Sequence, residues 1–140
     1  MTTQTTDSPR YGMGLHLEAP FAEAVEQTRA ALKEQGFGIL TEIDVQQTLK
    51  EKLAASFRRY VILGACNPPL AKRALEAEIG IGLLLPCNVV VYEEEGGGSR
   101  VEAMDPRVAL GVVGNPAIES IAVEARARLQ AALDTLQRGG

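Results

Sequence analysis

Two Cys-Asn dipeptides are the sharpest chemical feature of this chain, and they contain both of its cysteines. Cys66-Asn67 is followed by Pro68, and Cys87-Asn88 is preceded by Pro86. An Asn-Pro pair is typical of a helix start, whose N–H groups and dipole favour a thiolate. Pro86 removes a hydrogen-bond donor from an apolar run, so that strand is interrupted or lies at an edge. We therefore expect both cysteines at breaks in buried strands, on the wall of one pocket.

Three kinds of function are compatible with these cysteines. The one we favour is a small binding module whose pocket takes a soft metal such as Cu(I), a sulfur species or a small anion. A structural zinc site needs four ligands, whereas the chain has 2 Cys and 1 His. The second is a thiol redox enzyme, with Cys66 as the reactive thiol and Cys87 as its partner. The third is a structural or interaction protein whose cysteines only pack as small apolar side chains.

Further polar residues are candidates for the rim of such a pocket. Glu42, Asp44 and Lys52 lie at a strand end and on the next helix, although a capped, solvated helix face explains them as well. His16 points away from the apolar side of the first strand, which is typical of a surface residue. A chain with one histidine offers few acid–base groups, so no catalytic residue is assigned, and the sequence does not identify a cofactor. The predicted ligand-binding residues are Cys66, Asn67, Cys87, Asn88, Glu42, Asp44 and Lys52, with Cys66 and Cys87 as the candidate metal ligands.

Hydrophobic periodicity predicts a single α/β domain with the order βαβαβαββα. Strands are expected at residues 11–18, 37–43, 60–65, 81–93 and 100–104, and residues 105–114 are expected to be a loop. Helices are expected after Pro20, Asp44, Asn67 and Asn115, the second with Val45, Leu49 and Leu53 facing inward. The three glycines 96–98 form a hairpin, which must be antiparallel, whereas crossover helices permit parallel neighbours. We therefore expect one mixed sheet covered by helices.

Length and composition restrict the partners of the domain. Residues 1–10 are polar and predicted to be a flexible tail, and residues 11–140 are predicted to be one domain. A net charge of −4 argues against nucleic-acid binding. The longest apolar run, residues 81–92, is too short to span a membrane, and residues 1–10 lack the apolar stretch of a signal peptide, so we expect a cytoplasmic protein. That run and the Leu-rich last helix leave surplus apolar surface, which predicts a homodimer.

Several segments of the sequence resemble those of one protein family. These are residues 36–45 (GFGILTEIDV), 60–68 (YVILGACNP), 82–89 (GLLLPCNV), 104–106 (MDP) and 113–115 (VGN). Together they resemble the bacterial and archaeal family known as domain of unknown function 302, over about residues 21–136. The resemblance implies a small α/β domain that forms a homodimer, and it assigns no activity and no catalytic residue. The positions that match the family pattern are Glu42, Asp44, Lys52, Cys66, Asn67, Pro68, Pro86, Cys87 and Asn88.

Overall fold

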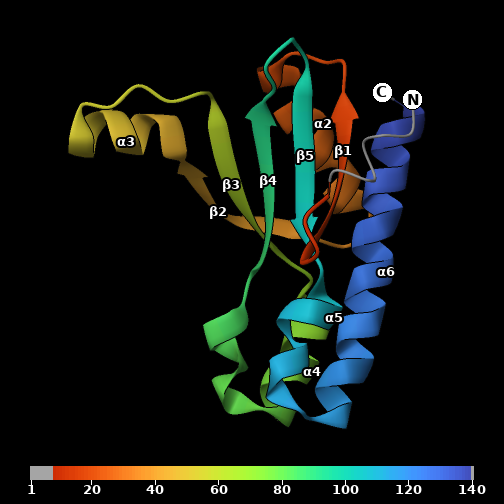
Figure 1. Cartoon of the computed structure of the whole chain (residues 1–140). Coiled ribbons are helices and arrows are strands. Elements are labelled where there is room, and N and C mark those ends of the chain that lie inside the picture. The colour runs from red at the N-terminus through yellow and green to blue at the C-terminus, as the bar shows by residue number, and fades with distance from the viewer. Residues whose placement is uncertain (1–7, 140) are drawn as a thin grey trace.

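The chain folds around one five-stranded sheet, as the computed structural model of residues 8–139 shows (Figure 1). The strand order is β1-β5-β4-β3-β2, and every neighbouring pair is antiparallel. The strands are β1 (Gly12–Leu17), β2 (Gly38–Asp44), β3 (Tyr60–Cys66), β4 (Cys87–Glu93) and β5 (Ser99–Met104). The α/β class and the single sheet are thus confirmed.

The expected parallel neighbours are absent from this sheet, for a topological reason. β2 and β3 are adjacent, as are β3 and β4, so the helical segments between them belong to long hairpin connections rather than crossovers. The helix between β1 and β2 does cross the sheet, but it joins the two edge strands, which do not pair. Helices between strands therefore did not mean parallel pairing here.

Helices begin where the sequence predicts them. They are α2 (Phe21–Glu34), α3 (Val45–Leu53), α4 (Pro68–Ala77) and α6 (Pro116–Gly139). Asp44 caps α3 by accepting a hydrogen bond from the Gln47 N–H, and Asn67 caps α4 by accepting one from the Leu70 N–H. Gly36 follows α2 with a positive φ of 85°, which favours glycine. Within the described residues, no helix is long and apolar enough to cross a membrane.

Three local predictions were wrong. Residues 81–84 of the expected strand 81–93 belong to a 3₁₀ helix, η1 (Ile79–Leu84), and β4 begins only at Cys87, after Pro86, which cannot donate to a strand ladder. The expected loop 105–114 contains α5 (Pro106–Ala109) and a 3₁₀ turn, η2 (Gly111–Val113). Helix α3 has no buried residue, and Leu53 is 70% exposed, so it does not face the core. Most of the predicted tail, residues 1–7, lies outside the described residues.

Buried side chains form two hydrophobic cores. The sheet core fills the space between the strands and the helices α2 and α6, with Leu15, Leu63, Val91 and Leu129 among its most buried members. The helical core lies beyond one end of the sheet, among α4, η1, α5 and the first half of α6 (Figure 1). The long helix α6 contributes to both cores, since its 24 residues bury Ile118, Ile121, Ala122 and Ala125 in one and Leu129, Ala132, Leu133 and Leu136 in the other.

Candidate functional site

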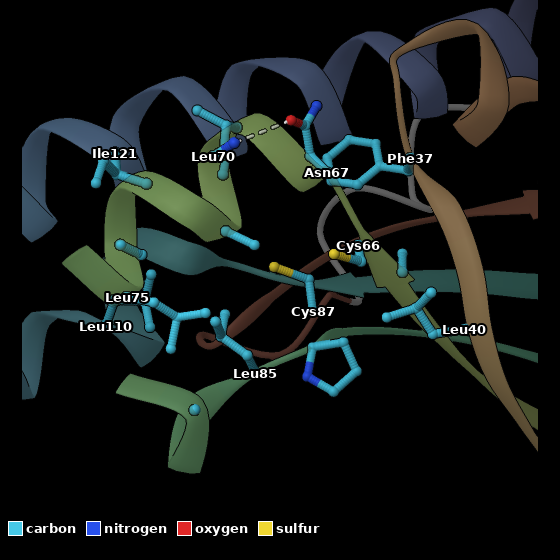
Figure 2. A pocket seen from close by; sticks show the side chains of 16 residues that line it. Phe37, Leu40, Cys66, Asn67, Leu70, Leu75, Leu85, Cys87, Leu110 and Ile121 are labelled. Atoms are coloured by element: carbon cyan, nitrogen blue, oxygen red, sulfur yellow. Dashed lines mark hydrogen bonds between the residues drawn. The ribbon is translucent and has the colours of Figure 1, made fainter. Parts of the chain in front are cut away.

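A cavity of about 280 Å³ lies where the two cores meet. It is at the end of the sheet where β3 ends and β4 begins. Figure 2 shows its wall, with Leu75, Leu110 and Ile121 on one side and Phe37 and Leu40 on the other. The remaining lining residues come from the same two junctions of strand and helix: Ala65, Cys66, Asn67, Leu70, Ala71, Ala74, Gly82, Leu85, Pro86, Cys87 and Ala125. Both Cys-Asn segments therefore reach one cavity, as predicted, although Asn88 is not part of the wall.

Two local features of the backbone shape this cavity. The register between β2 and β3 shifts between Ile39 and Thr41, and this bulge places Leu40 at the cavity, with 66% of its surface exposed. Pro86 lies against Gly64 of β3, where a Cβ atom would come within 2.8 Å of the proline ring. A glycine at position 64 therefore allows the segment before β4 to approach the sheet so closely.

The wall of the cavity is almost entirely apolar. Its main polar side chain, Asn67, is buried, and its own hydrogen bonds occupy it. The Oδ1 atom accepts from the Leu70 N–H at 3.2 Å, and Nδ2 donates to the Gln35 carbonyl at 3.4 Å. Since the amide holds the start of α4 in place, it offers little to a polar ligand. An anion in this cavity would lose its hydration without gaining a charged partner.

The two cysteines line the cavity without being near each other. Cys87 pairs across the sheet with Ala65, so its side chain lies on the core face, whereas Cys66 is one residue further along β3. Successive residues of a strand point to opposite faces, which separates the two side chains. Both thiols are free. Burial, together with a smaller electrostatic contribution from Cys66, raises the pKa of the Cys87 thiol to about 11, which keeps it protonated at neutral pH.

The other predicted ligand-binding residues lie elsewhere. Glu42 forms an ion pair with Arg29, and Asp44 is occupied in capping α3. Lys52 is exposed on α3, and Asn88 is exposed on β4. His16 contacts Glu94 and Glu18 at the surface of the β1 end, on the side opposite the buried residues of that strand, as predicted. Of the predicted residues, Cys66, Asn67 and Cys87 thus line the cavity, and none of the predicted charged residues does.

Sequence reasoning missed the apolar majority of the wall. Phe37, Leu40, Leu70, Leu110 and Ile121 look like ordinary core residues in the sequence. Nothing in their spacing distinguishes a side chain that fills a core from one that borders a void, because that depends on the packing of distant elements. The two Cys-Asn dipeptides and the break at Pro86 are the sequence signals that mark this region.

The residues that the structure describes contain no group of three or more His, Cys, Asp or Glu side chains arranged to hold a metal ion. A soft metal held by Cys66 and Cys87 would therefore lack a third His, Cys, Asp or Glu ligand among the described residues. The separation of the two thiols adds to this difficulty, because a shared ion must lie about 2.3 Å from each sulfur.

Comparison with known proteins gives a family but no activity. The sequence model of the family "Domain of unknown function DUF302" matches residues 13–136. A solved structure described as an uncharacterized conserved protein DUF302, from Bacillus stearothermophilus, is 33% identical in sequence. The match covers 90% of this chain and 98% of that one, with a TM-score of 0.83. A comparison with curated proteins finds no match. With most of its length matched and its fold shared, this chain belongs to the DUF302 family.

Proposed function

We propose that this protein is a binding module for a small apolar molecule, which occupies the cavity between the two cores. The observation that supports this most strongly is the composition of the wall, where leucine, isoleucine, alanine and phenylalanine side chains surround one internally bonded asparagine and two thiols. Ligand pockets in proteins are concave and mostly apolar, with few polar groups. A void of this kind gains free energy when an apolar ligand restores the missing van der Waals contacts.

The size of the cavity limits the ligand. At about 280 Å³ it is near the lower end of the range for small-molecule pockets, and about twice the volume of an engineered cavity that takes benzene. A single ring with substituents or a medium-length alkyl chain matches this volume. Leu40 and Leu75 are exposed members of the wall, so we place the entrance between β2 and α4.

This proposal replaces the soft metal, sulfur species and anion that the cysteines first suggested. A metal would lack further ligands, and an anion would lack a charged partner in the wall. The redox alternative is also disfavoured, since the two thiols are apart and burial keeps Cys87 protonated. The cysteines act in this proposal as small apolar wall residues, and the thiol of Cys66 is not required.

Titration with octan-1-ol and with cyclohexanol, followed by methyl NMR, tests the proposal. Wild-type protein should show saturable shifts at Leu70, Leu110 and Ile121. Ala71→Phe places a large side chain in the wall and should weaken binding at least tenfold. Ala77→Phe is the matched control, because Ala77 is exposed on the same helix and outside the wall, and it should bind like wild type. Cys66→Ala should also bind like wild type.

Other outcomes would remove the proposal. If neither alcohol gives saturable shifts, or if Ala77→Phe weakens binding as much as Ala71→Phe, the cavity is not the site. If the wild-type protein instead binds Cu(I) in a stoichiometric ratio and Cys66→Ser abolishes that binding, the metal function takes its place. If none of these ligands binds, the purely structural alternative is favoured.

A further inference from the structure

A shallow groove on the surface of α4 is continuous with the cavity between the two cores. Three residues line both of them, namely Cys66, Ala71 and Leu75. The groove is completed by Pro68, Lys72, Glu76 and Ile79. Positions 68, 71, 72, 75 and 76 are three or four residues apart, so they form one face of α4. The cavity therefore opens onto a helix face that carries one positive and one negative side chain.

The entrance is apolar at its neck and polar at its rim. Leu40 of β2 is 66% exposed and Leu75 of α4 is 37% exposed, and both belong to the cavity wall. Lys72 and Glu76 lie next to the shared residues Ala71 and Leu75, and their side chains are 74% and 62% exposed. A polar group beside them keeps its contact with water. An amphipathic ligand can therefore bury its apolar part in the cavity while its polar end stays hydrated.

Lys72 is held only by a weak intrahelical ion pair. Its Nζ atom donates to the carboxylate of Glu76, four residues further along α4. Ion pairs at such an exposed position contribute little to stability. At this spacing, a lysine on the N-terminal side of a glutamate is also the less favourable order. Lys72 can therefore exchange Glu76 for the carboxylate of a ligand at little cost.

The position of the groove along α4 favours an anion at the rim. The groove begins at Pro68, the first residue of the helix, where the helix dipole places partial positive charge. Lys72 follows one turn later, and Glu76 lies another turn away from that end. Arg73 is paired with Glu124 of α6, so it does not compete for the same group. A negative polar end beside Lys72 is therefore better placed than a positive one.

We propose that the ligand is an aliphatic carboxylate, with its alkyl chain in the cavity and its carboxylate at the rim beside Lys72. The inference rests on the proposed function and adds the chemical class of the ligand. It differs from the small anion disfavoured above, because the charged group stays outside the apolar wall. The volume of about 280 Å³ equals roughly nine groups of the size of water, which takes about 30 Å³ in the liquid. A methylene group is of similar size, so a chain of roughly eight carbons fits.

Three ligands with the same chain and different polar ends test the proposal by isothermal titration calorimetry. They are octanoate, octylammonium and octan-1-ol. Wild-type protein should bind octanoate about threefold more tightly than octylammonium, which is the size expected for one exposed ion pair. In NMR spectra of the wild type, the signal of the Lys72 ε-methylene group should shift with octanoate and not with octan-1-ol.

Charge variants of the rim should change this preference in opposite directions. Lys72→Glu should make octylammonium the tighter ligand. Glu76→Gln frees Lys72 and removes a negative charge, so it should raise the preference for octanoate to about tenfold. Lys50→Glu is the matched control, because Lys50 is an exposed lysine on α3 outside both the groove and the cavity. It makes the same change in net charge as Lys72→Glu and should keep the wild-type preference.

The ratio of the two affinities is the readout, because a change in the cavity itself affects both charged ligands alike. If wild type binds octan-1-ol but binds octanoate no more tightly than octylammonium, this inference is wrong and the proposed function stands. An unchanged preference in Lys72→Glu or Glu76→Gln would also overturn it, as would an equal effect of Lys50→Glu. If none of the three ligands binds, the proposed function fails, and this inference fails with it.

Discussion

The sheet core and the helical core are built differently, although α6 runs through both. The sheet core joins five strands with two long helices, and its central residues Leu63, Val91 and Val101 have no exposed surface. The helical core contains far fewer side chains, which come from α4, η1, Leu110 at the end of α5 and half of α6. The cavity lies at the boundary and takes its wall from both cores. The comparison shows where a small protein can keep a void: between two packed units rather than inside either of them.

Truncating one leucine in each core measures this difference. Leu63→Ala removes a side chain that is fully enclosed in the sheet core, so the variant should lose about 4 kcal/mol of unfolding free energy. Leu110→Ala removes a side chain that already borders the cavity and so has fewer neighbours, and it should lose about 2 kcal/mol. Urea denaturation of both variants and wild type gives the two values. Equal losses would mean that the boundary is packed as tightly as the sheet core.

The titration of Cys87 tests whether the boundary is dry. Burial raises the pKa of its thiol from 9.0 to about 11, so the folded state holds this proton more tightly than the unfolded state. The resulting stabilisation is fully present below pH 9 and is lost as the pH rises from 9 to 11, by about 3 kcal/mol. Urea denaturation across this range should show the loss in wild type, relative to Cys87→Ala.

Cys87→Ala also serves as the control for other groups that titrate at alkaline pH. Tyr92, whose pKa burial raises to about 12, is present in both proteins, and its effect cancels in the comparison. If the cavity were filled with water, the Cys87 thiol would be hydrated and its pKa would stay near 9. Wild type and Cys87→Ala would then lose stability in parallel above pH 9.

Much of the fold could be predicted from local sequence signals. The last helix was predicted to begin after Asn115, and the apolar residues that it buries, from Ile118 to Leu136, recur at helical spacing in the sequence. The Asn67-Pro68 and Asp44 caps were found because capping depends on residues three positions apart. The alternation of Met13, Leu15 and Leu17 against His16 fixed the inward face of β1.

Features that depend on distant elements could not be predicted in this way. Val45, Leu49 and Leu53 have the spacing of an inward-facing helix, but no element of the same chain covers them. The strand order depends on which strands pair with each other, which the local sequence does not show. Helix α4 lies between two strands that pair antiparallel, but in the sequence it looks the same as a helix that connects two parallel strands. The prediction that both cysteines line one cavity is confirmed. Their separation could not be predicted, because the pairing of Cys87 with Ala65 sets the face of the sheet on which each side chain lies.

Xenon is the most direct probe of the central claim, that the boundary between the cores holds a dry, accessible apolar cavity. Xenon binds such voids without requiring any specific contact. Methyl NMR under xenon pressure should show saturable shifts for Leu70, Leu85, Leu110 and Ile121, which line the cavity, and none for Leu15 and Leu129 in the sheet core. Equal shifts throughout the protein, or no shifts at the four lining residues, would contradict the account.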